Sequence, residues 1–209
     1  MAHLRRDAVL RPLIDELPFP EQRPQLSEIY PALLRSIVGQ QVSTAAAASI
    51  YRRFLELFDC DPQDPYACPR PEQVTAADQD DLRGAGLSRA KANYVRAVAT
   101  YFAERPHAEQ HLRALDDEAA VAELTAIKGV GRWTAEMMLL FALGRPDVLP
   151  LDDLAVRQSI LQRYALDPDQ RPAALRKQMM QLAEAWRPYR SYACLYLYAW
   201  RNAQKKPLR

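Results

Sequence analysis

The sequence predicts an all-α protein of about ten short helices. Apolar residues recur at helical spacing in several segments; Ile50, Phe54 and Leu57, for example, are separated by four and three residues. No segment shows the sustained alternation of apolar and polar residues that is typical of a half-buried strand. A chain of 209 residues is long enough to bury a core as one domain or as two closely joined subdomains.

Each predicted helix has its own apolar stripe or boundary signal. Ser43 or Thr44 is expected to cap the second helix, and Gly86-Leu87-Ser88 precedes the fifth, whose apolar face includes Val95 and Phe102. The proline-rich segment 58–72 is predicted to be a loop. The predicted helices are 29–38, 43–57, 71–76, 78–84, 89–105, 117–126, 132–143, 154–164, 173–186 and 191–201.

Composition excludes several classes of protein. Hydrophobic residues make up 49% and charged residues 26%, as in an ordinary soluble globular protein. No apolar run approaches the roughly 20 residues of a membrane span, and the N-terminus lacks the apolar core of a signal peptide. A cytoplasmic protein without a membrane partner is expected. The net charge is only +2, so any basic surface for nucleic acid must be local.

The three cysteines, Cys60, Cys68 and Cys194, show no Cys-x-x-Cys spacing. Neither a zinc site nor a four-cysteine iron–sulfur site can be built from them. Structural roles in a reducing compartment are the expectation.

The segment from Leu124 to Asp153 contains a glycine turn between two predicted helices. Glycine permits backbone angles that a Cβ would forbid, so Gly129-Val130-Gly131 is expected to expose N–H groups just before the next helix. Such a helix start suits a phosphate. Arg132 lies in the first turn, where its charge opposes the helix dipole unless an anion is near. A simple helix stop is the alternative interpretation of the two glycines.

Two adjacent carboxylates, Asp152 and Asp153, precede the predicted helix 154–164. One is expected to cap that helix, which leaves the other to face a cleft. A carboxylate stabilises the positive charge that builds on a sugar when its C1′–N bond breaks, and it can orient water. Position 133, two residues past the glycine turn, holds Trp133 rather than a lysine, which excludes a Schiff-base nucleophile there.

The C-terminal segment is dense in aromatic residues. Tyr192, Tyr196 and Trp200 are four residues apart and form a predicted core stripe, whereas Tyr198 points away from it. An aromatic ring near a carboxylate can stack on a base. Arg187 and Arg190 are expected either to reach phosphates or to be solvated.

Three blocks, 35–43, 124–158 and 186–193, together resemble the helix–hairpin–helix DNA glycosylases of the 3-methyladenine DNA glycosylase II branch. The resemblance covers most of residues 30–201. It implies two helical subdomains, 30–147 and 1–29 with 148–209, flanking a DNA-binding cleft, with the helix–hairpin–helix motif at 124–143. It also implies an enzyme that flips an N-alkylated purine, of the 3-methyladenine or 7-methylguanine type, out of duplex DNA and hydrolyses its glycosidic bond.

The resemblance assigns roles to individual residues. The catalytic block Asp-x-x-apolar-basic fits Asp153 through Arg157, although counting from Pro150 would favour Asp152. The remaining assignments are a base pocket of Trp133, Met137 and Tyr198; a wedge, Gln41, that fills the gap left by the flipped base; and DNA contacts from Gly129, Val130, Gly131, Arg132 and Arg190.

No cofactor is expected to be required, and no iron–sulfur cluster is expected. The carbonyls of Gly129 and Gly131 are the candidate ligands of a structural Na⁺ or K⁺ ion. The expected protein is a monomer that excises bases without cutting the strand. The alternatives are a DNA-binding module without activity, a glycosylase for oxidised or mismatched bases, and a helical scaffold; Asp153 together with the aromatic block argues against the first.

Overall fold

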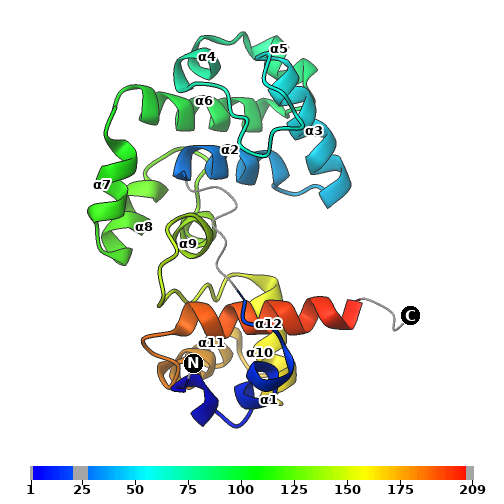
Figure 1. Ribbon diagram of the computed structural model, residues 1–209, viewed down its shortest axis with the longest axis vertical. Coiled ribbons are helices and arrows are strands. Elements are labelled where there is room, and N and C mark those ends of the chain that lie inside the picture. Colours follow the sequence, from blue (N-terminus) through cyan, green and yellow to red (C-terminus); the bar gives the residue numbers. More distant parts are fainter. Residues whose placement is uncertain (1, 21–27, 206–209) are drawn as a thin grey trace. The chain divides into compact units, whose positions relative to one another are not determined.

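The computed structural model describes residues 2–20 and 28–205, and every regular element within these ranges is a helix (Figure 1). The predicted all-α class is confirmed. The chain divides into two compact units, Pro24–Leu143 and Met1–Arg23 with Gly144–Arg209, which we call the hairpin unit and the terminal unit. The division predicted from the sequence cuts the chain after residues 29 and 147 instead. No helix in the described part of the chain is long and apolar enough to cross a membrane.

The hairpin unit is built around two helices, α2 and α6, which lie side by side and run in opposite directions (Figure 1). Leu33, Leu34 and Ile37 of α2 are fully buried, as are Ala92 and Val95 of α6. Its helices are α2 (Ile29–Gly39), α3 (Thr44–Glu56), α4 (Pro71–Ala76), α5 (Gln79–Gly84), α6 (Arg89–Ala103), α7 (Ala108–Ala114), α8 (Asp117–Thr125), α9 (Arg132–Met137) and the π-helical η2 (Met138–Ala142).

The expected helix starts are confirmed where serine precedes them. The Ser43 hydroxyl accepts a hydrogen bond from the Ala46 N–H at 3.3 Å, and Ser88 accepts one from Lys91 at 3.2 Å. The predicted helix 132–143 is not uniform, because its second half is the π-helical η2. Such wide turns occur frequently at functional sites.

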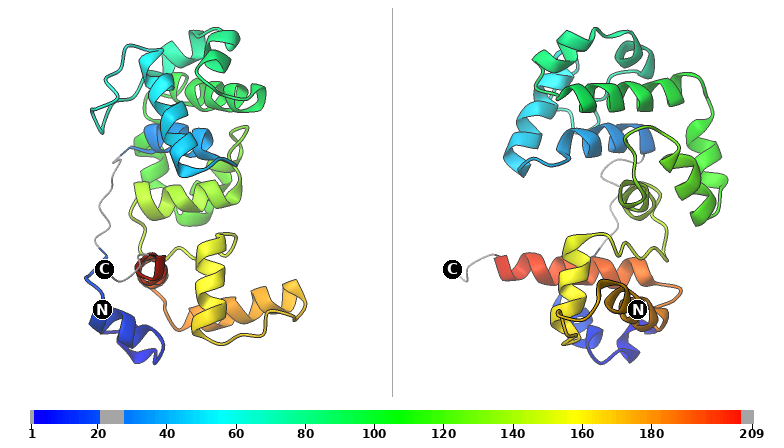
Figure 2. Two further views of the ribbon diagram at one scale, coloured as in Figure 1. Left: turned by 90° about the vertical axis from the view of Figure 1, so that its right-hand side faces the viewer. Right: turned by 180° about the vertical axis from the view of Figure 1, so that it is seen from behind.

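The terminal unit packs α10 (Leu154–Arg163) against the long C-terminal α12 (Arg190–Lys205) (Figure 2). Its other helices are η1 (Leu4–Arg6), α1 (Leu10–Glu16) and α11 (Pro172–Glu184). The predicted aromatic stripe of α12 is only partly a core stripe: Tyr196 is buried, whereas Tyr192 and Trp200 are half-buried at the edge of the core.

The Asp7 carboxylate is one of the groups that connect the N-terminal segment to the rest of this unit. Asp7 Oδ1 accepts hydrogen bonds from the Val9 and Leu10 N–H groups at 2.8 and 3.0 Å. Asp7 Oδ2 accepts hydrogen bonds from the Tyr164 hydroxyl at 2.8 Å and from Trp186 Nε1 at 3.0 Å. Trp186 is fully buried, so its N–H depends on this partner. The N-terminal residues therefore belong to the folded core.

We expect Asp7→Ala to lower the free energy of unfolding by about 3 kcal/mol or more, because it removes a helix cap and orphans a buried indole N–H. Asp15→Ala is the matched control, since Asp15 pairs with Arg5 while both side chains are about half exposed (51% and 53%). That control should change stability by less than about 1 kcal/mol. Urea denaturation followed by circular dichroism measures both, and equal losses would contradict the role of Asp7.

Alkaline pH is expected to destabilise the hairpin unit through Tyr30, which is 7% exposed. Burial raises the pKa of Tyr30 above its ordinary value of 10.0. The stabilising contribution is complete below about pH 10 and is lost as the pH rises toward the folded-state pKa, because only the unfolded chain then releases the proton. The free energy of unfolding should fall with a slope that approaches about 1.4 kcal/mol per pH unit because of this residue.

Urea denaturation between pH 9 and about pH 11 tests this dependence, with Tyr30→Phe as the control that should reduce the slope. Among the described residues the Tyr30 hydroxyl has no hydrogen-bond partner. Tyr30→Phe should therefore also be at least as stable as the parent at neutral pH. An unchanged slope in the variant would assign the alkaline effect to other groups.

Candidate active site and nucleic-acid interface

The glycine turn between α8 and α9 uses its two glycines for different purposes. Gly129 has a φ of +93°, and a Cβ there would lie 2.2 Å from Cγ of Tyr94. Gly131 has a φ of −91° and a ψ of 170°, which any residue adopts, and a Cβ there would meet nothing within 4 Å. The expectation that both glycines provide unusual backbone angles is therefore wrong for Gly131. Its missing side chain instead leaves open space at the start of α9.

The amides of the turn are partly occupied by the chain itself. The Val130 N–H donates to the Ile127 carbonyl at 3.0 Å, and the Val130 side chain is buried. Val130 thus supplies no exposed N–H group, contrary to expectation, and any anion site must use the amides that follow it. The Gly129 carbonyl accepts from Gln40 Nε2 at 3.3 Å, and the Gly131 carbonyl accepts from the Ala135 N–H at 3.0 Å.

The Arg132 guanidinium already has two carboxylate partners. It pairs with Glu118 at 2.8 Å and with the buried Glu136 at 2.9 Å. The hydrogen bond from Arg132 holds the pKa of Glu118 below its usual range, and Glu118 in turn raises the pKa of Arg132. An arginine at this helix start therefore does not require an external anion, which removes the sequence-based reason for placing a phosphate beside its side chain.

The loop that carries the predicted wedge lies between α2 and α3 and is tied to the hairpin. Gln41 is exposed and has a φ of +56°, which is uncommon for a residue other than glycine. Its neighbour Gln40 donates to the Gly129 carbonyl of the glycine turn. Lys91 Nζ donates to the Val38 carbonyl at 2.8 Å and so holds the end of α2. Backbone strain of this kind often marks functional loops.

A cleft of about 600 Å³ within the hairpin unit is lined by three of the predicted site residues, Gln41, Gly131 and Trp133. Trp133 lies in its wall and is 39% exposed, so this tryptophan is not a core residue. Met137 is buried and does not line the cleft. Sequence reasoning assigned no role to most of the other lining residues. The complete lining is Arg35, Ser36, Gly39, Gln40, Gln41, Gly131, Trp133 and Thr134.

In the terminal unit, the two candidate carboxylates have distinct environments. Asp153 is half-buried and is the N-cap of α10, since its Oδ1 accepts from the Val156 N–H at 2.9 Å. Asp152 is exposed and pairs with Arg176 at 2.6 Å. The expectation that one aspartate caps while the other stays free is therefore wrong, because both are engaged and the capping residue is Asp153.

Tyr198 of α12 lies near enough to this capping carboxylate to feel its charge. Burial raises the pKa of Tyr198 well above its ordinary value, and the negative charge of Asp153 raises it further. The structure thus places two of the predicted site residues, Asp153 and Tyr198, on the adjoining α10 and α12 region of the terminal unit.

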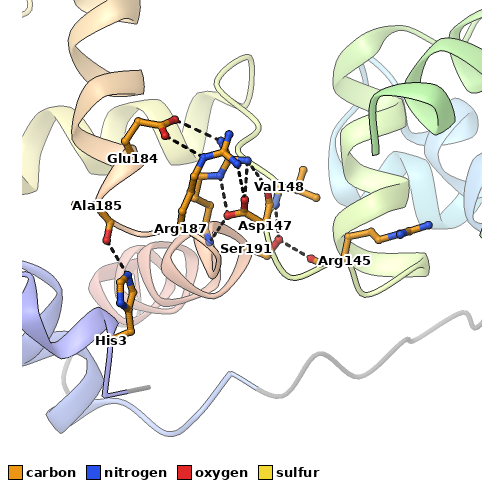
Figure 3. A network of polar contacts seen from close by, with 9 residues as sticks. His3, Arg145, Asp147, Val148, Glu184, Ala185, Arg187 and Ser191 are labelled. Atoms are coloured by element: carbon orange, nitrogen blue, oxygen red, sulfur yellow. Dashed lines mark hydrogen bonds and ion pairs between the residues drawn. The ribbon is translucent and has the colours of Figure 1, made fainter. Parts of the chain in front are cut away.

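The segment that leads to these aspartates is anchored by an ion-pair network around Asp147 (Figure 3). Arg190 binds both carboxylate oxygens of Asp147, at 2.8 and 3.0 Å, and its side chain is only 15% exposed. Arg187 bridges Asp147 and Glu184 at 3.0 and 2.9 Å. Arg190 is thus neither solvated nor available to a phosphate as it stands, whereas Arg187 is ion-paired and still 51% exposed.

Ser191 extends the same anchor (Figure 3). Its hydroxyl accepts from the Val148 N–H at 2.9 Å and donates to the Arg145 carbonyl at 2.6 Å. Ser191 is fully buried, so these bonds satisfy an otherwise orphaned hydroxyl. Residues 145–148 are thereby fixed to the start of α12 before the chain reaches Asp153.

An all-helical chain with a glycine hairpin, a strained loop beside it and a capping carboxylate next to a tyrosine has the architecture of a helix–hairpin–helix repair protein. The comparison with known families agrees. The chain belongs to the HhH-GPD superfamily of base excision DNA repair proteins, whose family profile matches residues 34–186.

Individual relatives share this architecture over most of the chain. The chain is 32% identical to DNA-3-methyladenine glycosylase 1 of Schizosaccharomyces pombe over 196 residues, which cover 91% of this chain and 81% of that protein. It is 32% identical to the putative DNA-3-methyladenine glycosylase YfjP of Bacillus subtilis, covering 84% of this chain but only 59% of that protein. A solved structure of S. pombe 3-methyladenine DNA glycosylase in complex with abasic DNA matches with a TM-score of 0.79 and 26% identity, covering 100% of this chain and 98% of that one.

Proposed function

We propose that this protein is a monofunctional DNA glycosylase that flips N-alkylated purines out of duplex DNA and hydrolyses their N-glycosidic bond. The observation that carries the proposal is the Asp153 carboxylate, held half-buried at the start of α10 by the Val156 N–H. A DNA-binding module needs no such carboxylate. The relatives named above, which are described as DNA-3-methyladenine glycosylases, support the same activity.

In the proposed reaction the protein need not supply a strong general acid for the leaving base. An N-alkylated purine already carries positive charge, so the electron pair of the breaking C1′–N bond neutralises the base as it departs. The Asp153 carboxylate stabilises the positive charge that develops on the sugar. A water oxygen then bonds to C1′ and its proton is released, leaving a free base and an abasic site. Trp133 offers no amine for a covalent intermediate, so the strand is not cut.

The proposed DNA interface uses backbone groups and the loop that carries Gln41. The amides at the start of α9, beside the open space at Gly131, would hold a phosphate, and Gln41 would fill the gap left by the flipped base. Because Arg132 and Arg190 are bound to carboxylates, they are secondary candidates for DNA contacts. Trp133, Met137 and Tyr198 stay the residues proposed to contact the flipped base.

The alkali ion expected from the family resemblance is also proposed to bind at the glycine turn. The carbonyls of Gly129 and Gly131 each accept one hydrogen bond from the chain and keep a second lone pair, so their chemistry suits a Na⁺ or K⁺ ion. Such an ion would add positive charge near a bound phosphate. No other cofactor is proposed. All proposed groups come from one chain, so we propose a monomer acting on alkylated double-stranded DNA.

Release of free bases from methylated duplex DNA tests the function directly. We expect chromatography to show 3-methyladenine and 7-methylguanine in the released fraction, with strand breaks only after alkali treatment. Unmethylated DNA is the control. Tight DNA binding without any base release would contradict the proposal and favour a binding module, and breaks before alkali would contradict the monofunctional mechanism.

A further inference from the structure

We propose that Arg35 of α2 binds a phosphate of the DNA strand at the cleft that carries the predicted wedge, Gln41. This inference deepens the proposed glycosylase function and rests on its DNA interface. It concerns one guanidinium group, for which neither composition nor spacing indicated a partner.

The proposed DNA interface needs a cation that the arginines expected from the sequence do not supply. Contacts from Lys and Arg to phosphates provide a large share of the affinity of a protein for DNA, and with a net charge of only +2 these cations must be placed locally. Arg132 and Arg190 each have a carboxylate partner at 2.8 Å, Glu118 and Asp147 respectively. A phosphate could bind either arginine only by displacing that partner.

Arg35 has the position that such a cation requires. It lines the cleft of about 600 Å³ together with Gln41, Gly131 and Trp133. The residue is exposed, and in the part of the chain that the structure describes it forms no ion pair with a carboxylate. Its positive charge is therefore available to an anion that enters the cleft.

Arg35 is held by an aromatic ring instead of a carboxylate. Its guanidinium carbon lies 4.6 Å from the ring centre of Tyr51 on α3, and Tyr51 is only 7% exposed. Such a cation–π contact orients the guanidinium over a fixed surface but supplies no negative charge. Burial raises the pKa of the Tyr51 hydroxyl, and it raises the pKa of the nearby Cys68 thiol to about 12, so both groups are neutral at physiological pH. Arg35 thus keeps its full charge.

The geometry of DNA brings phosphates to this cleft once the wedge is in place. Duplex DNA carries one negative charge for about every 1.7 Å of its axis, and a phosphate lies on each side of the flipped nucleotide. Arg35 lies on α2 and Gln41 on the loop that follows it, and both line the same cleft. A strand whose base gap is filled by Gln41 therefore has phosphates within reach of the other cleft residues. The planar guanidinium fork binds two phosphate oxygens at once.

The dependence of DNA affinity on salt tests this assignment, because each phosphate contact releases counterions. Fluorescence anisotropy measures binding of the parent and of Arg35→Gln to duplex DNA with a tetrahydrofuran abasic analogue, in KCl from about 50 to about 200 mM. We expect Arg35→Gln to bind about tenfold more weakly, and its plot of log affinity against log salt concentration to be less steep by about one unit. Arg35→Lys keeps the charge and should keep the parent slope.

Two further variants separate a phosphate contact from packing and from net charge. Arg35→Met keeps an unbranched side chain against the Tyr51 ring without the charge, so it should show the same reduced slope as Arg35→Gln. Arg83→Gln is the matched control, because it removes the same charge from α5, where Arg83 pairs with Asp80 and does not line the cleft. Its slope should remain that of the parent. Urea denaturation of each variant shows whether the fold is intact.

A parent-like slope in Arg35→Gln and Arg35→Met would overturn the inference, and so would an equal reduction in Arg83→Gln, which would report net charge alone. Weaker binding at an unchanged slope would also overturn it, because Arg35 would then act only through its packing on Tyr51. None of these results affects the proposed function, which instead fails if the parent protein binds DNA but releases no alkylated base.

Discussion

Asp153→Asn is expected to lower the rate of alkylpurine release about a thousandfold, equivalent to roughly 4 kcal/mol of transition-state stabilisation. The amide has nearly the same shape but no negative charge to oppose the positive charge on the sugar. Asparagine is also a good N-cap, so the hydrogen bond from the Val156 N–H and the start of α10 should survive. The loss should therefore appear in the chemical step and not in folding or DNA affinity.

Asp152→Asn is the matched control, because the neighbouring carboxylate has the same chemistry but pairs with Arg176 at the surface. Its rate of base release should remain close to that of the parent. Single-turnover kinetics on DNA with one 7-methylguanine, together with binding to an abasic analogue, measure both variants. If Asp152→Asn lost activity while Asp153→Asn retained it, the assignment of the catalytic aspartate would be wrong by one residue.

The helices that the sequence predicts are those with a clear apolar stripe or cap. α6 is the best example, since Ser88 caps it and Val95 lies on its buried face. Periodicity does not predict α1 or α7, because each has only seven residues, too few to show a repeat. Tertiary contacts stabilise them instead: Tyr164 and Trp186 donate hydrogen bonds to Asp7 beside α1, and Glu109 of α7 accepts hydrogen bonds from the Ile29 and Tyr30 N–H groups.

Parts of the candidate site depend on partners that are distant in sequence. Arg190 is bound by Asp147, 43 residues earlier, and Arg132 is bound by Glu118, 14 residues earlier. Sequence spacing reveals neither pair, so both arginines appear available for phosphates when only the sequence is considered. The cap of α10 is different, because adjacent aspartates directly before a helix predict that one of them caps it, and the structure shows that this residue is Asp153.

The two glycines of the hairpin look equivalent in the sequence, and their difference yields the second large prediction. We expect Gly129→Ala to lower the free energy of unfolding by about 3 kcal/mol or more. A Cβ at a φ of +93° is strained, and here it would lie 2.2 Å from Cγ of Tyr94 on α6. The hairpin would have to shift, which should also weaken DNA binding.

Gly131→Ala supplies the control that separates folding from function. Its φ of −91° suits alanine and the added Cβ meets no atom within 4 Å, so stability should be unchanged or rise by up to about 1 kcal/mol. The affinity for duplex DNA should nevertheless fall about tenfold if a phosphate approaches this backbone. Urea denaturation and fluorescence anisotropy measure the two quantities. Unchanged affinity in Gly131→Ala would place the phosphate elsewhere, because the hairpin backbone in that variant would be intact.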